Sequence, residues 1–376
     1  MQYRAFGKTG EQVSVLGYGC MRFPLTNRED HGSIDKEQAK AMLRHAIDSG
    51  VNYVDTAFFY HDGKSESFVG EALKDGYREK VLLATKAPFG DYQSKDDFWE
   101  KLHTQLERLQ TDVIDCYLLH CVTKRNWQDS ALKHGLIDEM VKAREQGKIR
   151  YIGFSYHDDY ALFTEVCDAF AWDFCQLQIN YVDVENQAGM AGVAYAASRG
   201  IPVIAMEPLL GGRLADPPQN VKSALPQGKS PQGKSPVHAA FDFLWSRPEI
   251  PLLLSGMGAM GQVEENLRYA DAARTNCVSQ EELRQYDNAR HIFEHSALVS
   301  CTACEYCMPC PFGVKIPEVF MQYNRTVHSM RSAKEAYAAI DGDASLCQAC
   351  TVCEQKCPQH IPISEEMARV ARIFGE

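Results

Sequence analysis

Two runs of cysteines near the C-terminal end are the most regular chemical pattern in the sequence. Residues 301–311 read CTACEYCMPCP, and residues 347–358 read CQACTVCEQKCP. Cysteines at three-residue steps, followed by one more that precedes a proline, are typical of 4Fe-4S clusters. Zinc sites are also built from such pairs, but they typically have two pairs rather than two runs of four. The spacing therefore favours two 4Fe-4S clusters over zinc.

The second run has the C-x2-C-x2-C-x3-C-P spacing of bacterial ferredoxins, in which the fourth cysteine binds the other cluster. By that rule one cluster is assigned to Cys301, Cys304, Cys307 and Cys357, and the other to Cys347, Cys350, Cys353 and Cys310. The first run departs from the rule, because two residues rather than three separate its last two cysteines. The other six cysteines lie mostly in apolar contexts and are interpreted as packing residues.

Four polar side chains follow apolar segments earlier in the chain: Asp55, Tyr60, Lys86 and His120. Reduction of a carbonyl places negative charge on its oxygen, so a proton donor must wait there. Tyr60 is the candidate donor, because a nearby Lys86 ammonium favours the phenolate and brings its pKa closer to neutrality. Asp55 would hold Lys86 in place, and a neutral His120 would orient the substrate carbonyl.

These groups need a scaffold that brings them together. From about residue 13 to residue 273 the sequence repeats a short β-branched run, a polar turn and a segment with helical periodicity. Strands are predicted over 13–17, 53–56, 81–85, 114–119, 151–154, 174–179, 203–205 and 252–254. Helices are predicted between them, for example over 33–49, 95–109 and 136–145.

Eight strand–helix units in about 270 residues indicate an α/β fold, a closed (β/α)8 TIM barrel, with active-site residues at the carboxyl ends of its strands. The alternative is an open doubly wound sheet. That fold would need a Gly-x-Gly-x-x-Gly turn after the first strand, whereas residues 17–22 read GYGCMR. A duplicated PQGKS sequence at 226–235 is interpreted as a surface loop, either a lid or a tolerated duplication.

On these residues the sequence resembles the aldo-keto reductase family over about residues 1–275. The family's Asp, Tyr, Lys and His tetrad matches Asp55, Tyr60, Lys86 and His120 in order and placement, and residues 3–10 match a hairpin that closes the barrel floor. The resemblance implies an oxidoreductase that reduces an aldehyde or ketone with NAD(P)H, or oxidises the corresponding alcohol. The implied substrate is a small carbonyl compound or alcohol.

The resemblance also implies an extended nicotinamide dinucleotide across the barrel mouth, with the carboxamide on the fifth and sixth strands. Glycines after the seventh strand would approach the pyrophosphate, and a helix N-terminus after the eighth would bind the adenosine end. The implied cofactor contacts are Ser155, Gln176, Met206, Pro208, Leu209, Gly211, Ser255, Gly256, Gln262, Glu265 and Asn266.

Some of these positions depart from the family pattern. Met206 stands where most members stack an aromatic ring on the nicotinamide, and Tyr156 replaces an asparagine. Gly256 and Gln262 stand where NADP-preferring members place a Lys and an Arg, so a 2′-phosphate loses a bidentate partner. On family grounds NADP is still expected rather than NAD, with Arg268 as a candidate substitute cation.

Composition limits the partners. The 376 residues include 39 basic and 50 acidic side chains, giving a net charge of −11, and 45% are hydrophobic. This excludes a mostly disordered chain and argues against nucleic acid or an anionic membrane as the main partner. We find no signal-peptide pattern and no membrane-spanning apolar stretch, so a cytoplasmic protein is expected. Two oxidised clusters would bring the charge to about −15, which favours a basic redox protein as a partner.

The composition changes abruptly near residue 300. We predict a barrel over residues 1–280, a connecting helix over 281–299 and a small α-helical ferredoxin-like domain over 300–376. Helices are expected within the last domain at 316–323, 333–340 and 363–373. Nicotinamides transfer two electrons as hydride, whereas clusters move one at a time, and no flavin site is identified that would join them. The alternative function is a ferredoxin-like electron-transfer or redox-sensing protein that uses the barrel as a scaffold.

Overall fold

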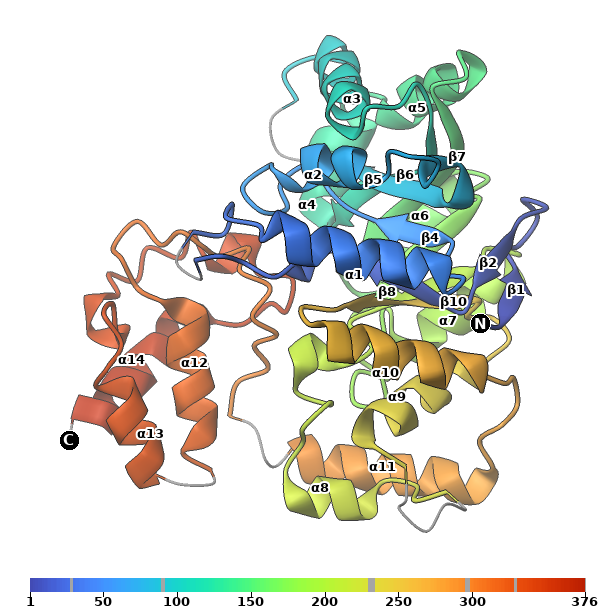
Figure 1. Cartoon of the computed structure of the whole chain (residues 1–376). Coiled ribbons are helices and arrows are strands. Elements are labelled where there is room, and N and C mark those ends of the chain that lie inside the picture. Colours follow the sequence, from blue (N-terminus) through green and yellow to red (C-terminus); the bar gives the residue numbers. More distant parts are fainter. Residues whose placement is uncertain (28–29, 89–91, 229–233, 295–297, 328–329, 376) are drawn as a thin grey trace. The chain divides into compact units, whose positions relative to one another are not determined.

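The computed structural model describes the whole chain except residues 28–29, 89–91, 229–233, 295–297, 328–329 and 376 (Figure 1). Its contacts divide the chain into two compact units. The first comprises Met1–Pro208 with Ala240–Ser279, and the second comprises Leu209–Ala239 with Gln280–Glu376. The centre of the duplicated PQGKS sequence falls on 229–233, so the lid hypothesis lies outside the described residues.

The first unit contains a closed barrel of eight parallel strands, each hydrogen-bonded to the next in chain order. The strands are β3 (Leu16–Gly19), β4 (Tyr53–Asp55), β5 (Leu82–Ala87), β6 (Ile114–Val122), β7 (Ile149–Tyr156), β8 (Phe174–Gln178), β9 (Val203–Met206) and β10 (Leu252–Gly256). β10 pairs with β3 and closes the ring. The predicted TIM barrel is confirmed, and the open doubly wound sheet is wrong.

A hairpin of β1 (Tyr3–Ala5) and β2 (Gln12–Ser14) precedes the barrel. Phe6, in the turn between them, is fully buried, and its ring lies 6.2 Å from that of Tyr53 and 5.2 Å from that of Phe174. The hairpin therefore closes one end of the barrel. The predicted strand 13–17 is wrong at its start, because one apolar run supplies the end of the hairpin and then the first barrel strand.

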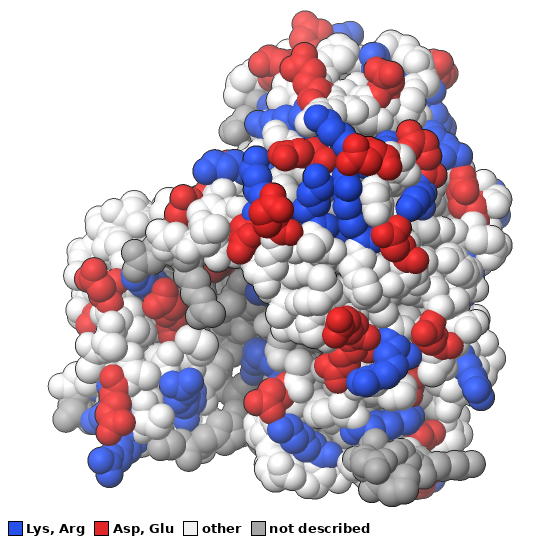
Figure 2. All heavy atoms as spheres, viewed as in Figure 1, with Lys and Arg blue, Asp and Glu red and all other residues white. Residues whose placement is uncertain are grey.

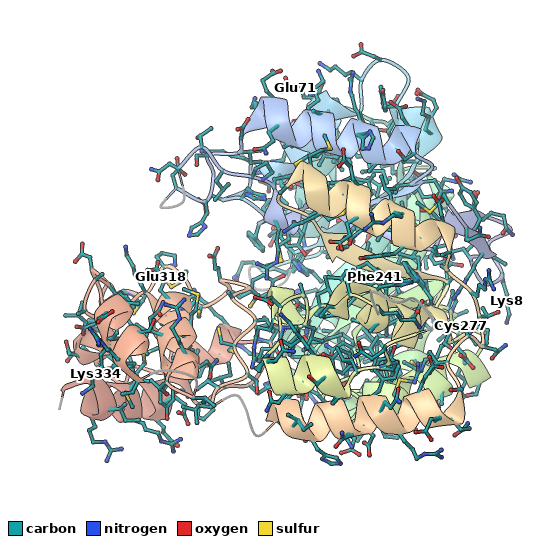
Figure 3. All side chains as sticks on the ribbon, turned by 60° about the horizontal axis from the view of Figure 1, so that its bottom comes forward. Lys8, Glu71, Phe241, Cys277, Glu318 and Lys334 are labelled. Carbon is teal, nitrogen blue, oxygen red and sulfur yellow. The ribbon has the colours of Figure 1, made fainter. Side chains whose placement is uncertain are left out.

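Helices cover the outside of the barrel, as expected for parallel strands whose two faces are both buried. They are α1 (Lys36–Asp48), α2 (Ser65–Ala72), α3 (Asp96–Leu109), α4 (Lys124–Asn126), α5 (Leu136–Glu145), α6 (Tyr160–Ala169), α7 (Gly189–Ser198), α9 (Pro236–Trp245) and α10 (Met260–Asp271). α1 begins where the Asp35 carboxylate accepts a hydrogen bond from the Gln38 amide, a typical N-cap. In Figure 3, Phe241 of α9 lies in the interior, whereas Lys8 points to solvent.

The second unit is helical. Its helices are α8 (Gln219–Ala224), α11 (Gln280–Glu294), α12 (Ile316–Arg325), α13 (Met330–Tyr337) and α14 (Ile363–Gly375). α12 and α14 share a core that includes Phe320 and Met367, both fully buried. The predicted helices at 316–323 and 363–373 agree with α12 and α14. The one expected at 333–340 lies three residues earlier, because the chain turns after Tyr337 and Gly342 adopts a φ of 111°.

Surface charges of both signs are mixed. Figure 2 shows Lys and Arg interspersed with Asp and Glu on the face in view. Ion pairs of the first unit include Lys36 with Glu71 at 3.2 Å and Lys80 with Asp48 at 2.9 Å. None of the described helices combines the length and the apolar character that crossing a bilayer requires.

Candidate active site and iron–sulfur site

Three neighbouring barrel strands carry the polar residues that the sequence singled out. Asp55 is the last residue of β4, Lys86 is the penultimate residue of β5, and His120 lies near the end of β6. Because the strands are parallel and adjacent, their carboxyl ends meet at one rim of the barrel. The fold therefore brings together side chains that lie about 30 residues apart from one another in the sequence.

Lys86 is the centre of this group. Its Nζ donates to Asp55 Oδ1 at 2.6 Å and to the Thr56 carbonyl at 2.8 Å, and only 2% of the residue is exposed. Burial by itself lowers the pKa of Lys86, but the neighbouring Asp55 and Tyr60 raise it above its ordinary value. Burial raises the pKa of Asp55, and the ammonium opposes that rise. A buried charge of this kind is tolerated only when it is paired.

Tyr60 comes from the loop that follows β4. Lys86 Nζ lies 3.5 Å from its hydroxyl and 5.0 Å from the centre of its ring. The loop is held by backbone hydrogen bonds from Tyr60 to the Ala57 carbonyl at 3.2 Å and from Ser65 to the Tyr60 carbonyl at 3.1 Å. The half-buried phenol is therefore placed beside the ammonium by the backbone as well as by its own contact.

His120 completes the group. Its ring centre lies 6.1 Å from that of Tyr60 in an edge-to-face arrangement. Burial lowers the pKa of His120 well below its ordinary value, and the positive charge of Lys86 and the neighbouring His157 lower it further. The imidazole is therefore neutral at pH 7 and has one N–H to donate.

The lowered pKa of His120 predicts acid sensitivity of the first unit. Below about pH 6.5 the unfolded chain protonates this histidine and the folded chain does not, so stability falls with falling pH until the folded pKa is reached. We expect His120→Asn to make this loss shallower by about 1.4 kcal/mol per pH unit, the value for one proton. Urea unfolding followed by tryptophan fluorescence measures it, because all 4 tryptophans lie in the first unit. Equal slopes in both proteins would contradict the assignment.

Two of the implied cofactor residues lie beside the tetrad. Gln176, on β8, is 2% exposed and interacts with Asp55, while its Oε1 has no hydrogen-bond partner among the described residues. An unpaired buried oxygen suits an N–H donor such as a carboxamide. Ser155 Oγ accepts from the Cys121 amide at 3.3 Å. Tyr156, which replaces the asparagine of the family pattern, is buried in the core, and its hydroxyl donates to the Asp159 carbonyl at 2.6 Å.

The other implied cofactor residues occupy separate places. Met206 ends β9 half-buried and Pro208 lies two residues later, whereas Leu209 and Gly211 belong to the second compact unit. After β10, Asn266 Nδ2 donates to Ser255 Oγ at 3.1 Å, which joins the strand end to α10. The last two implied cofactor residues lie in the first half of that helix and are hydrogen-bonded within the protein. Gln262 Oε1 accepts from the Gly258 amide at 2.9 Å, and Glu265 accepts from the Tyr269 hydroxyl at 2.5 Å.

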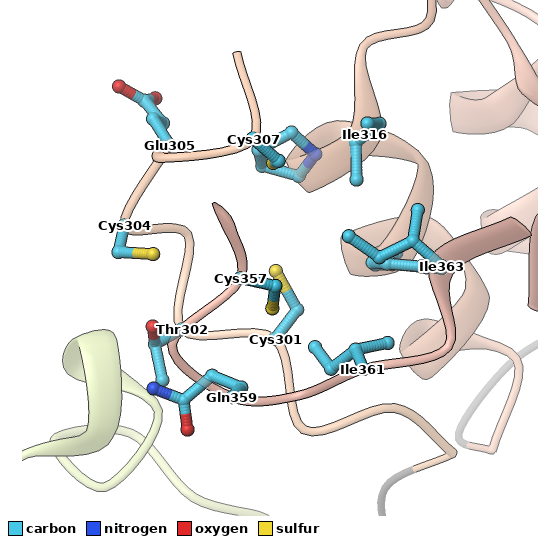
Figure 4. Close-up of a pocket in the computed structure, with 12 residues that line it drawn as sticks. Cys301, Thr302, Cys304, Glu305, Cys307, Ile316, Cys357, Gln359, Ile361 and Ile363 are labelled. Carbon is cyan, nitrogen blue, oxygen red and sulfur yellow. The ribbon is translucent and has the colours of Figure 1, made fainter. Parts of the chain in front are cut away.

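Four of the eight cysteines line one pocket in the second unit: Cys301, Cys304, Cys307 and Cys357. Figure 4 shows their side chains around a common space, closed on one side by Ile361 and Ile363. Burial raises the pKa of Cys307, and the other three thiols raise it further. Among the described residues, no three His, Cys, Asp or Glu side chains stand close enough together to hold a single metal ion. A 4Fe-4S cluster instead takes its four thiolates separately, one on each iron. Thiolates and apolar walls are the surroundings that a 4Fe-4S cluster uses.

The second run forms a looser group. Burial raises the pKa of Cys353 to about 11, and the charges of Glu354, Cys347 and Cys350 contribute to the rise. Cys310 packs against the same hydrophobic core as Cys347 and Cys353. Cys301 and Cys357 pack against that core too, so this contact does not separate the two sets. The crossed pairing, in which each run supplies one cysteine to the other cluster, stays a prediction.

Comparison with known sequences identifies the larger part of the chain. A sequence model of the aldo/keto reductase family matches residues 15–288. The chain belongs to the aldo/keto reductase family. A model of a 4Fe-4S dicluster domain matches residues 300–362. This aldo-keto reductase-like oxidoreductase therefore carries a C-terminal 4Fe-4S domain, and both resemblances drawn from the sequence are confirmed.

Individual relatives agree with this membership. L-galactose dehydrogenase of Arabidopsis thaliana is 29% identical over 308 residues, covering 76% of this aldo-keto reductase and 93% of the plant protein. Aldo-keto reductase YhdN of Bacillus subtilis is 34% identical over 165 residues, covering 41% of this chain and 47% of its own. The holo form of aldo-keto reductase AKR11C1 from Bacillus halodurans shares the fold, with a TM-score of 0.65 at 24% identity over 77% of this chain and 96% of that one.

In this aldo-keto reductase, Arg22 is a cation near the implied cofactor positions that the sequence analysis did not consider. It ends a short 3-10 helix (Cys20–Arg22) directly after β3, and its side-chain carbons lie about 3.2 Å from where a Cβ of Gly256 would stand. The missing side chain at Gly256 thus leaves room for Arg22. Arg268, the cation proposed from the sequence, is 71% exposed and lies 4.0 Å from Glu265. The signal for Arg22 was its place after the first barrel strand.

In the second unit, which carries the 4Fe-4S domain, we expect one glycine to tolerate substitution poorly. Gly211 has a φ of 65°, and a Cβ there would collide with the backbone of Thr302, which follows Cys301. Gly212 has a φ of 93° but nothing within 4 Å of its Cβ position, which makes it a matched control. We expect Gly211→Ala to destabilise the unit by about 1–3 kcal/mol more than Gly212→Ala and to lower iron incorporation. Iron per chain and thermal unfolding measure this, and equal values for the two variants would contradict it.

Proposed function

We propose that the protein reduces an aldehyde or ketone with NADPH or NADH, or oxidises the corresponding alcohol. One observation carries the proposal: Lys86 Nζ lies 2.6 Å from Asp55 and 3.5 Å from the Tyr60 hydroxyl, in a buried site beside a neutral His120. A bound nicotinamide would supply a hydride, and iron–sulfur clusters would supply or accept single electrons. The residues described below supply binding, orientation and the proton.

Each member of the tetrad has a separate role. His120 donates its N–H to the substrate oxygen and orients the carbonyl. As that oxygen gains negative charge, the Tyr60 hydroxyl gives it a proton. The Lys86 ammonium stabilises the phenolate that remains, and Asp55 holds Lys86 in position. In the alcohol-oxidising direction the same proton returns to Tyr60.

The chain's own residues also support a site for the dinucleotide. The unpaired Gln176 Oε1 suits the carboxamide, with Ser155 beside it, and Asn266 and Ser255 mark the adenosine end. Arg22 next to Gly256 supplies a cation for a phosphate group, in the place of the Lys and Arg that the sequence lacks. We therefore favour NADP over NAD, with Arg22 rather than Arg268 as the phosphate partner.

For the second unit we propose two 4Fe-4S clusters, bound by the crossed sets of cysteines. The pocket lined by Cys301, Cys304, Cys307 and Cys357 supports the first set. We propose a barrel over 1–280, a connecting helix over 281–299 and a cluster domain over 300–376, although the contacts group Leu209–Ala239 with the residues that follow 280. The clusters would then act either as electron carriers or as a structural core.

The test uses the protein purified without air, with both clusters loaded. NADPH and NADH are offered with a panel of aldehydes, ketones and sugars, and the loss of nicotinamide absorbance is followed. Sugars belong in the panel because one relative is named L-galactose dehydrogenase. Turnover of a carbonyl supports the proposal. If no member of the panel is reduced, and no alcohol is oxidised in the reverse assay, the reductase assignment fails.

A second candidate is an electron-transfer or redox-sensing protein that uses the barrel as a scaffold. The dicluster match and the four-cysteine pocket favour it. The same preparation discriminates, because cluster absorbance bleaches on reduction. Carbonyl turnover without bleaching by NAD(P)H places the clusters outside the catalytic path. Clusters that cycle with a basic redox protein, while no carbonyl is turned over, favour this second candidate.

A further inference from the structure

Glu66 is a fully buried carboxylate that the proposed chemistry does not use. It lies in the first turn of α2, and none of its surface is exposed. Its Oε1 accepts from Thr85 Oγ1 at 2.7 Å and from Gln105 Nε2 at 2.6 Å, and its Oε2 lies 3.3 Å from Arg108. Burying a carboxylate costs folding free energy unless it is fully paired. The hydrogen bonds of Glu66 therefore restrain the positions of its partners as well as its own.

One branch of these contacts reaches Lys86. Gln105 Nε2 also donates to the Lys86 carbonyl at 3.1 Å, and Thr85, the residue before Lys86, donates to Glu66. The Gln105 amide cannot turn, because its oxygen accepts from the Tyr117 hydroxyl at 2.7 Å. The backbone at Lys86 is therefore restrained by side chains of α2 and α3 as well as by the hydrogen bonds of the sheet.

The other branch reaches the loop of Tyr60. Arg108 lies 3.4 Å from the Phe58 carbonyl, and its guanidinium lies 4.3 Å from the centre of the Phe58 ring. Phe58 is two residues before Tyr60 in the same short loop. Arg108 thus joins the Glu66 carboxylate to the loop that presents the phenol.

We propose that Glu66 is a positioning residue that sets the separation between the Lys86 ammonium and the Tyr60 hydroxyl. The inference rests on the proposed function, since it concerns the same proton-donating pair. Each of its two branches holds one partner, Lys86 on β5 and Tyr60 in the loop that follows β4. The 3.5 Å between Lys86 Nζ and the phenol is already at the long limit of a hydrogen bond. A displacement of a few tenths of an ångström would therefore break the contact while leaving the fold intact.

The test is Glu66→Gln, with Glu139→Gln as its matched control. Glu139 is also a buried carboxylate, 5% exposed, and it accepts from Trp99 at 2.9 Å and Lys142 at 2.7 Å on α5, away from the tetrad. We expect Glu66→Gln to lower kcat by about 10- to 100-fold with an unchanged KM for the dinucleotide. The alkaline limb of kcat against pH should move to higher pH, because the ammonium stabilises the phenolate less. Glu139→Gln should change neither quantity.

A second readout does not need turnover. The tyrosinate absorbance of Tyr60 is the difference between a protein and its Tyr60→Phe variant. It is titrated against pH in the wild type and in Glu66→Gln, and the midpoint should lie at higher pH in Glu66→Gln. If Glu66→Gln does not fold, the same measurements are made on Arg108→Gln. Arg108 is partly exposed, and its substitution removes only the contacts that join Glu66 to the loop of Tyr60. Unchanged titration and kcat in a folded variant would overturn the inference. Failure of the proposed function is recognised separately, as wild type without carbonyl turnover, while the absorbance titration still tests Glu66.

Discussion

Replacing Tyr60 by phenylalanine is expected to lower kcat for carbonyl reduction by about 10²- to 10⁴-fold, the range for loss of a positioned acid or base. The substitution removes one oxygen atom, the only group of the side chain that can give a proton. Lys86 keeps its contacts with Asp55 at 2.6 Å and with the Thr56 carbonyl at 2.8 Å, so the site should stay assembled. Initial rates at saturating NADPH measure kcat, and fluorescence titration should show unchanged dinucleotide affinity.

Tyr77→Phe is the control for that experiment. Its hydroxyl donates to Asp48 at 2.7 Å on the surface, so its removal tests the loss of a tyrosine oxygen that the proposed mechanism does not use. The control should turn over at the wild-type rate. If Tyr60→Phe also keeps the wild-type rate, another group gives the proton and the tetrad is only a structural cluster.

Replacing Cys357 by serine is expected to remove the first cluster and about half of the iron, that is about four of eight atoms per chain. Cys357 comes from the second run but lines the pocket with Cys301, Cys304 and Cys307. Because cluster binding contributes directly to folding free energy, the second unit should also unfold at lower temperature. Iron analysis and visible absorbance measure the first effect, and calorimetry measures the second.

Cys277→Ser is the matched control, since Cys277 is half-buried in the first unit and lies outside both runs. It should keep the iron content and colour of the wild type. Unchanged iron in Cys357→Ser would show that the fourth ligand comes from elsewhere and would end the crossed pairing. A colourless wild type that carries zinc would end the iron–sulfur assignment as a whole.

Local sequence was enough to predict the kind of fold. The strands from β4 onward lie within about two or three residues of their predicted positions, because each is a short apolar run bounded by polar turns. The tetrad could be recognised because three of its members end neighbouring strands, and strand ends can be read from the sequence. The 4Fe-4S domain could be recognised from the spacing of its cysteines, since a cluster imposes its own geometry on the chain, whereas the cluster that each cysteine binds stays a prediction. The first barrel strand was misplaced because one apolar run continues across a change of strand at Val15.

Only the tertiary structure decided which groups act on one another. Glu66 gives no sequence signal, since its partners Thr85, Gln105 and Arg108 are brought to it by the packing of α2 and α3 against the barrel. Arg22 meets Gly256 because β3 and β10 pair when the barrel closes. The neutral state of His120 depends on burial, which no single residue specifies. Hydrophobic periodicity determines elements locally, whereas charge states and contacts depend on neighbours that are distant in the chain.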